Sequence, residues 1–182
     1  MDLELVRLAQ QGDHEAFVAL ARSRGDRLFA IARRMLHDVG LAEDAVQQAL
    51  VIAWRELPRL RDPERFDAWL TRLLVHECFA EAKRGRRLAA NVHLLNLERS
   101  SPVDDTQSIL DRDQVERALR RLPPDQRAIL VLRHYVGLDP SEIAATLQIP
   151  DGTVRSRTHY AHQALRAALE ADLRPAPAGG ES

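Results

Sequence analysis

Residues Pro140–Arg157, with the sequence PSEIAATLQIPDGTVRSR, decide the fold that this chain predicts. Ile143 and Leu147 are spaced as the apolar anchors of a short helix, and Pro150 then interrupts the helical pattern. After the proline, a second helical pattern places Val154 on its apolar side. Two helices joined by a tight turn in this way are typical of a helix-turn-helix.

The residues of the turn support the same interpretation. Ala144 and Ala145 are small enough to let a second helix cross closely, and Ile149 provides an apolar residue just after the turn. Asp151 or Thr153 can cap the second helix. Gln148 stands where this turn often has glycine, because the backbone there enters the left-handed region.

The second helix has two chemically different faces. Its apolar face carries Val154, Thr158, Ala161 and Leu165. Its polar face, at the same helical spacing, carries Arg155, His159, His162 and Arg166. Such a face suits either solvent or DNA, and the helices around it favour DNA. Because residues near the start of a recognition helix reach base edges, we expect base contacts from Arg155 and Arg157 and backbone contacts from the histidines and Tyr160.

Composition limits the other possibilities. The chain of 182 residues is 45% hydrophobic and 29% charged, a globular balance with room for one good core or two small ones. Its net charge of −1 means that any surface for nucleic acid comes from local clustering. A single cysteine, Cys78, excludes an internal disulfide and a cysteine-based zinc site. No apolar run approaches the roughly 20 residues of a membrane span, and no signal peptide is recognisable, so we expect a cytoplasmic protein without membrane insertion.

Helical periodicity runs through nearly the whole chain and predicts an all-α fold: two small helical domains joined by a linker, the second containing the helix-turn-helix. Asp13 is expected to cap a long helix that Gly40 ends, Pro58 to end the next helix, and Pro63 to open another. The predicted parts are a first domain, a linker, a second domain and a disordered tail, at residues 1–87, 88–108, 109–173 and 174–182. Within the linker, Leu94, Leu95 and Leu97 could equally form a short docked helix.

Enzymatic activity finds little support. The stretch VHECFAEA begins like a zinc-protease helix, but the second histidine of HExxH would fall at Ala80. The seven histidines lack ligand spacing, and no glycine-rich phosphate loop is present. We therefore expect neither catalysis nor a cofactor nor a metal ion.

With both helical blocks considered, the chain resembles the bacterial RNA polymerase sigma factors of the extracytoplasmic-function group over roughly residues 2–173. EAFVALARSRGDRLFAIARRML resembles the opening helix of the family's first domain, and AEDAVQQALVIAWREL resembles its docking region for the clamp helices of the polymerase large subunit. FDAWLTRLLVHECFAEAKRGRR resembles the helix that melts and reads the −10 element. LPPDQRAILVLRHYVGLDPSEIAATLQIPDGTVRSR resembles the domain that reads the −35 element.

The resemblance implies three sets of site residues. Those for core polymerase are Glu43, Asp44, Gln47 and Gln48. Those for the −10 element are Arg61, Asp62, Arg65, Arg72, His76, Lys83, Arg84, Arg86 and Arg87. Those for the −35 element are Thr153, Arg155, Ser156, Arg157, His159, Tyr160 and His162. Trp54 and Trp69 lie in apolar registers, so we expect both to pack in the core rather than to stack on bases.

The expected function is therefore that of a sigma factor, which binds core RNA polymerase and promoter DNA and is held inactive by an anti-sigma factor. Departures from the family pattern are His76 and Ala80, where Asn and Asp are frequent, and Gln48, where Glu is frequent. The alternative is a stand-alone helix-turn-helix regulator. Such proteins usually dimerise, and this chain has no convincing heptad seam, while its near-neutral charge favours binding DNA with a partner's help.

Overall fold

The structure is a computed structural model that describes residues 3–91 and 108–173, with side chains placed for residues 3–85 and 114–171. These ranges consist of helices joined by short turns, without strands, as the sequence predicts. The eight α-helices are α1 (Leu3–Gln10), α2 (His14–Leu36), α3 (Val39–Glu56), α4 (Phe66–Asn91), α5 (Ser108–Arg121), α6 (Pro124–Leu130), α7 (Pro140–Leu147) and α8 (Asp151–Leu173). Short turns of other helical types are η1 (Leu57–Arg59), η2 (Pro63–Arg65) and the π-helical η3 (Val131–Val136). No helix in the described ranges is both long and apolar enough to span a bilayer.

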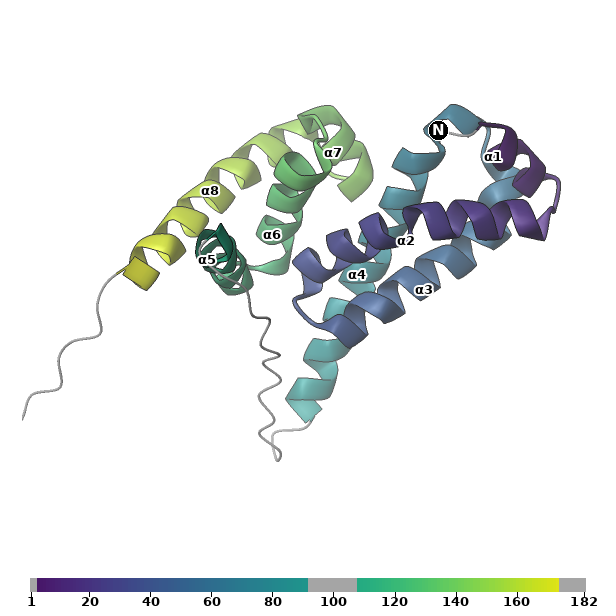
Figure 1. The fold of residues 1–182 in the computed structure, drawn as a ribbon. Coiled ribbons are helices and arrows are strands. Elements are labelled where there is room, and N and C mark those ends of the chain that lie inside the picture. The colour runs from purple at the N-terminus through teal and green to yellow at the C-terminus, as the bar shows by residue number, and fades with distance from the viewer. Residues whose placement is uncertain (1–2, 92–107, 174–182) are drawn as a thin grey trace, which may run out of the picture.

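The first domain is formed by α1–α4, in which α3 packs against both α2 and α4 (Figure 1). The buried face of α3 consists entirely of alanines. They are Ala42, Ala45, Ala49 and Ala53, and none exposes any surface. Alanine side chains let neighbouring helices approach closely, so the short side chains of α3 set its distance from α2 and α4.

Aspartate side chains cap the N-terminal ends of α2 and α3. The Asp13 carboxylate accepts a hydrogen bond from Ala16 N at 3.0 Å and caps α2, as predicted. The prediction that Gly40 ends this helix is wrong, because His37 takes the left-handed conformation (φ 55°) and Asp38 caps α3. Gly40 therefore lies in the first turn of α3.

The two prolines act close to where the sequence places them. Pro58 follows the end of α3 and lies in η1. Pro63 opens the turn η2, and α4 itself begins at Phe66. Helix α4 continues to Asn91, beyond residue 87. The remainder of the predicted linker, including its three leucines, lies outside the described residues, as does the tail 174–182.

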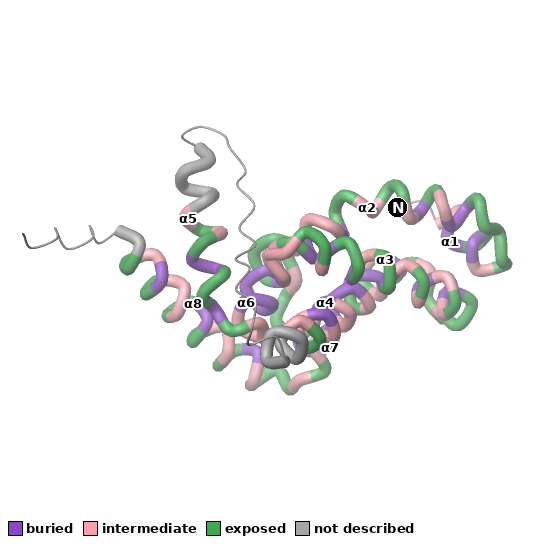
Figure 2. The backbone as a smooth tube through the Cα atoms, turned by 90° about the horizontal axis from the view of Figure 1, so that it is seen from below, coloured by how far each residue is buried: buried purple, intermediate pink, exposed green. Residues whose placement is uncertain are grey.

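The second domain is formed by α5–α8, with α8 contacting the other three helices. Its own cluster of buried residues includes Leu119, Leu122, Leu130 and Ala161. Figure 2 shows buried positions on α5, α6 and α8, and α8 contacts both α5 and α6.

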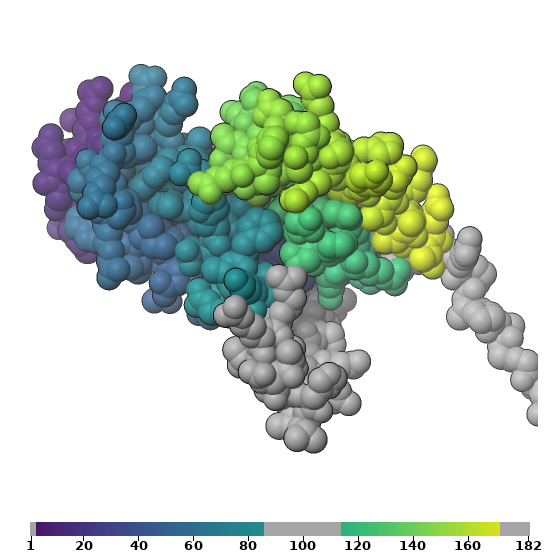
Figure 3. Space-filling model, turned by 180° about the vertical axis from the view of Figure 1, so that it is seen from behind, coloured from purple at the N-terminus to yellow at the C-terminus, as the bar shows by residue number. Residues whose placement is uncertain are grey.

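The two domains pack directly against each other. Helices α6 and α7 contact α4, and α6 and η3 contact α2. The largest apolar cluster runs through both domains, joining α1–α4 to buried residues of α6, η3, α7 and α8. Figure 3 shows the second domain, in green, lying against the teal surface of α4. One continuous core therefore underlies both domains.

Candidate functional site

Helices α7 and α8 form the predicted helix-turn-helix. At the start of α7, the Asp139 carboxylate accepts from Glu142 N at 2.9 Å, and the Glu142 carboxylate accepts from Asp139 N at 2.8 Å. The hydrogen bond from Glu142 N, followed by that from the Ser141 hydroxyl, lowers the pKa of Asp139. At the other end, Gln148 adopts the left-handed conformation (φ 55°), as expected at this turn, and Ile149 N donates to Ala144 O at 3.1 Å.

The crossing of the two helices depends on fewer small residues than predicted. Ile143 is fully buried, Val154 is 1% exposed and Ala144 is 5% exposed. Ala145 is exposed, because one further residue along a helix turns the side chain by about 100° away from the core. The prediction that Asp151 or Thr153 caps α8 is also wrong, since Pro150 O accepts the first helical hydrogen bonds.

The side of α8 that carries the predicted −35 residues faces solvent. The exposed members are Arg155, Ser156, His159, Tyr160 and His162, while Thr153 and Arg157 are half-buried. Arg157 forms an ion pair with Asp125 of α6, with 3.8 Å between Nη1 and Oδ2. Arg155 takes part in neither of the ion pairs of α8 within the described residues, which involve Arg157 and Arg166. Of the two arginines predicted to read bases, only Arg157 is engaged in an ion pair within the part of the chain that the structure describes.

A histidine outside the predicted set borders this surface. His134 of η3 approaches His162 with 2.9 Å between the two Nε2 atoms. Burial, followed by the charges of His162 and Arg133, lowers the pKa of His134. His162, His159 and Arg155 also line a shallow hollow that reaches Arg133. Sequence reasoning missed His134 because it lies 28 residues from His162 in another helix.

The second candidate surface lies on α4. Arg72, His76 and Lys83 follow one another at helical spacing, on the side opposite the buried residues Leu74 and Glu81. Arg72 and Lys83 are exposed and His76 is half-buried. Trp69, one turn before Arg72, is half-buried and packs on Phe66 with ring centroids 6.0 Å apart. The predicted basic face of α4 is thus a row of three basic residues, with two helical turns between His76 and Lys83, that begins one turn after an aromatic ring.

Two parts of the predicted −10 set are partly neutralised within the chain. Arg84 forms ion pairs with Glu81 (3.0 Å) and Glu77 (3.8 Å). In the preceding loop, Arg65 and Asp62 pair at 3.3 Å, and Asp62 also accepts from Glu64 N. The remaining members are Arg61, which is exposed, and Arg86 and Arg87, which belong to α4 but whose side chains lie outside the described residues.

The third candidate surface is the outer face of α3. Glu43, Asp44, Gln47 and Gln48 are all exposed, on the side opposite the buried alanines. The helix thus presents two carboxylates and two amides together, on a backbone that its inner face holds close to α2 and α4. Such a surface can bind a polar partner helix without any change in the core.

Comparison with known proteins identifies the family. Residues 20–88 match the family described as sigma-70 region 2, and residues 112–166 match sigma-70, region 4. The chain belongs to the sigma-70 family of RNA polymerase sigma factors. It is 31% identical to the RNA polymerase sigma-H factor of Pseudomonas aeruginosa, over 96% of this chain and 97% of that one. It is 32% identical to the ECF RNA polymerase sigma factor SigL of Mycobacterium tuberculosis, over 87% and 94%.

Solved structures agree in fold. The complex of CnrH with the cytosolic domain of CnrY matches with a TM-score of 0.68 and 29% identity, covering 94% of this chain and 98% of that one. The sigma factor RpoE of Bartonella quintana, crystallised with the anti-sigma factor NepR, matches with a TM-score of 0.72 and 25% identity, covering 86% and 98%. The protein is therefore an extracytoplasmic-function sigma factor that directs promoter-specific initiation, and the alternative of a stand-alone regulator is not supported.

The sigma factor has an apolar groove that sequence reasoning missed. It lies between α2 and α3, and its walls include Phe17, Leu50, Val51 and Trp54. Trp54 packs on Phe17 with ring centroids 5.1 Å apart, so it belongs to the core, as predicted, and also forms one wall of the groove. Gln47 of the predicted docking set lines the same groove. The signal in the sequence was Val51, an apolar residue on the outer side of α3 that is 38% exposed.

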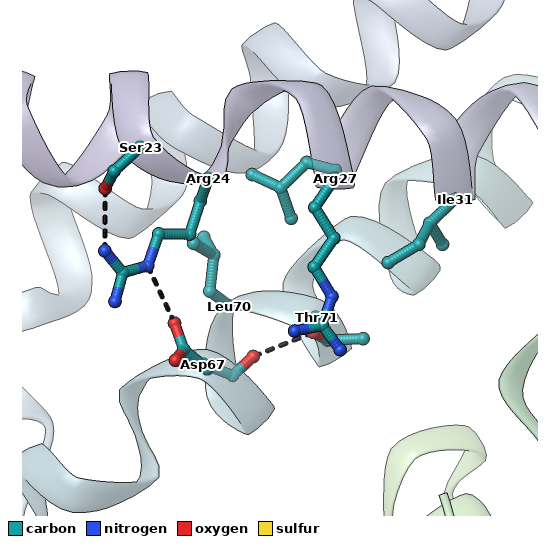
Figure 4. Close-up of a pocket in the computed structure, with 8 residues that line it drawn as sticks. Ser23, Arg24, Arg27, Ile31, Asp67, Leu70 and Thr71 are labelled. Atoms are coloured by element: carbon teal, nitrogen blue, oxygen red, sulfur yellow. Dashed lines mark hydrogen bonds and ion pairs between the residues drawn. The ribbon is translucent and has the colours of Figure 1, made fainter. Parts of the chain in front are cut away.

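Polar side chains in a hollow between α2 and α4 hold the start of α4 in place. Figure 4 shows Arg24 and Arg27 of α2 pointing into it from one side and Asp67 and Thr71 of α4 from the other. Arg24 Nε lies 3.1 Å from Asp67 Oδ1, and Thr71 donates to Asp67 O at 2.8 Å. The ion pair holds the first turn of α4 against α2, while the Thr71 hydrogen bond lies within α4, just before Arg72.

Proposed function

We propose that this sigma factor reads its promoter through two helices and binds core RNA polymerase through a third. The N-terminal half of α8 would enter the major groove of the −35 element. Arg155 would pair with a base edge, while Thr153, Ser156, Arg157, His159, Tyr160 and His162 would contact phosphates, sugars or neighbouring bases. The solvent-facing, helix-start position of Arg155 supports this assignment.

The stripe on α4 would bind the −10 strand. Arg72, His76 and Lys83, continued along the helix by Arg86 and Arg87, suit the spaced negative charges of a phosphate backbone. Arg61, Asp62 and Arg65 would contact a base flipped out of the strand, which costs a few kcal/mol of stacking that the loop must repay. Arg84 would contribute less than its neighbours, because Glu77 and Glu81 already neutralise it.

The outer face of α3 would bind the clamp helices of core polymerase. Glu43, Asp44, Gln47 and Gln48 would provide the polar contacts, and the adjoining groove of Phe17, Leu50 and Trp54 would receive an apolar side chain of the partner. A polar rim beside an apolar centre is the usual composition of a protein interface.

The same surfaces suit control by an anti-sigma factor. The Bartonella quintana RpoE was crystallised with the anti-sigma factor NepR, and the CnrH structure contains the cytosolic domain of CnrY. By analogy, a partner that covers α3 would prevent this chain from binding polymerase. We further propose that the chain acts in the cytoplasm, together with polymerase, and contributes no catalytic step, cofactor or metal ion of its own.

One observation carries the proposal: a helix-turn-helix with an exposed arginine at the start of its second helix occurs in the same chain as a basic stripe on α4. The test is transcription from a randomised promoter library with purified core polymerase and this protein, followed by sequencing of the transcripts. The expected result is protein-dependent initiation at sites that share a −35 and a −10 motif. Absence of initiation would refute the proposal.

A matched pair of variants tests the docking face separately. Asp44→Arg should reduce core binding at least tenfold, because it places a positive charge in the proposed contact. Asp26→Arg makes the same change at an exposed site of α2 outside all three surfaces and should bind core normally. Equal core binding by the two variants would contradict the assignment of α3.

A further inference from the structure

The polar hollow between α2 and α4 contains more positive charge than its own residues neutralise. It is lined by two arginines of α2, Arg24 and Arg27, and by one carboxylate of α4, Asp67, which leaves one positive charge in excess. Arg24 occupies that carboxylate, because its Nε lies 3.1 Å from Asp67 Oδ1, and its Nη1 donates to the Ser23 hydroxyl at 2.6 Å. Arg27, by contrast, has no hydrogen bond or ion pair to any residue within the described ranges.

The position of Arg27 makes its charge available to an anion from solution. Its side chain is exposed and extends from α2 toward Thr71 of α4 (Figure 4). The hollow has a volume of about 250 Å³, and three buried apolar residues form part of its lining, namely Leu28, Ile31 and Leu70. Apolar walls screen a charge less than water does, so an anion that enters the hollow meets a guanidinium without a counter-ion.

The neighbouring surface of α4 indicates which anion this is. Thr71 lines the hollow, and the next residue, Arg72, begins the basic stripe of Arg72, His76 and Lys83. One residue along a helix advances about 1.5 Å and turns about 100°, so the hollow and the stripe occupy adjoining faces of the same turn. A strand of nucleic acid that follows the stripe therefore reaches the hollow without a break. A free phosphate ion would occupy the hollow alone and would not need the stripe.

We propose that the hollow binds one phosphate of the DNA strand that the stripe on α4 holds, with Arg27 as its main ligand. A guanidinium can donate two parallel N–H groups to a phosphate. Arg24 can donate a third through Nη2, which takes part in neither of its two bonds described above. This inference rests on the proposed −10 function of α4, and it extends that surface onto α2, a helix for which the sequence predicts no DNA contact.

The test is a double-mutant cycle between the protein and single phosphates, carried out with holoenzyme. The probe is a forked fragment of a promoter that the holoenzyme transcribes, single-stranded through the −10 element. One linkage at a time carries an uncharged methylphosphonate in place of the phosphate. Such a cycle isolates the interaction between one side chain and one linkage, because a contact that is already lost cannot be lost twice.

Arg27→Ala should weaken binding to the native strand about three- to fivefold, the value of one exposed charge pair. At one linkage, methylphosphonate should weaken binding of the wild-type protein by a similar factor and should not weaken Arg27→Ala any further. The dependence of binding on salt should fall by about 0.7 in slope, the value for one phosphate of a single strand. Arg27→Lys should recover this slope, because the charge remains, but only part of the affinity.

The fold is expected to tolerate these changes, because alanine and lysine both favour helices and Arg27 is exposed. Thermal unfolding checks this directly. The matched control is Arg33→Ala, which removes an exposed arginine of the same helix that does not line the hollow. It should bind the native and every modified strand as the wild-type protein does.

Arg72→Ala, run through the same cycle, separates this site from the proposed function. It should interact with a linkage next to the one that Arg27 contacts. If Arg72→Ala interacts with a linkage and Arg27→Ala is additive at all of them, the phosphate site on α2 is wrong and the −10 surface of α4 stands. If neither residue interacts with any linkage, or if the holoenzyme transcribes no promoter, the −10 function of α4 is refuted and the phosphate site with it.

Discussion

Replacing Arg155 with alanine should weaken −35 recognition by about 1–3 kcal/mol, or roughly five- to 150-fold in affinity, the worth of one bidentate arginine–guanine pair. The structure favours a loss of binding free energy in the upper part of this range. Arg155 is exposed at the start of α8 and is bound in neither ion pair of that helix within the described residues, so among these residues binding DNA breaks no ion pair of Arg155. Arg157, by contrast, must first leave Asp125.

The assay is competition binding of holoenzyme to a labelled promoter, with single base-pair changes through the −35 element and at several salt concentrations. Loss of a base contact should remove discrimination at one base pair. Loss of a phosphate contact should instead weaken every sequence equally and reduce the salt slope by about 1. The two outcomes therefore separate base reading from backbone positioning.

Arg166→Ala is the matched control. It removes an exposed arginine from the same helix, about three turns further on, where Arg166 lies 4.0 Å from Glu170. Its effect should be several-fold smaller, because only the start of a recognition helix reaches base edges. Equal losses for the two variants, or unchanged base preference in Arg155→Ala, would refute the placement of α8 in the groove.

Three further predictions concern stability and reactivity. Gln148→Gly should stabilise the second domain by up to about 1 kcal/mol, because glycine enters the left-handed region without a Cβ clash, while Gly137→Ala (φ 86°) should destabilise it by a similar amount in thermal unfolding. Burial depresses the folded-state pKa of His37 to about 3, so its contribution to stability is present above the unfolded pKa of 6.5 and is lost as pH falls from there toward 3. His37→Gln should therefore flatten the acid side of the stability profile. The Cys78 thiol should resist alkylation at pH 8 in the native protein and react on unfolding, followed by mass spectrometry.

The sequence predicts the helices and their solvent-facing sides well, because both depend on local periodicity. The exposed positions of Arg155 and His159 follow from the apolar register that Val154 and Ala161 set, and these are 1% and 0% exposed. The ends of the helices are harder to predict from the sequence. The chain breaks at His37 and not at Gly40, because a non-glycine residue accepts a left-handed conformation when the next residue supplies a cap.

The features that could not be predicted from the sequence depend on contacts between residues far apart along the chain. Nothing near Arg127 distinguishes it from Arg120 or Arg121, yet it alone of these is buried and binds a carbonyl 92 positions away. Arg84 looks like one more cation in a basic run until the helix places Glu81 one turn before it. The groove beside Trp54 likewise requires two helices to be placed side by side.

The alanine seam of α3 has a consequence for how mutations act at a distance. The four alanines that face α2 and α4 have no side-chain torsions that could rearrange to absorb an added methyl group. A larger residue at Ala45 or Ala49 would push α3 away from α2 and α4. The exposed residues of α3 would move with it, namely Glu43, Asp44, Gln47 and Gln48. The distance between the proposed polymerase surface on α3 and the proposed −10 surface on α4 therefore depends on alanines that belong to neither surface, and a substitution there would change both surfaces at once.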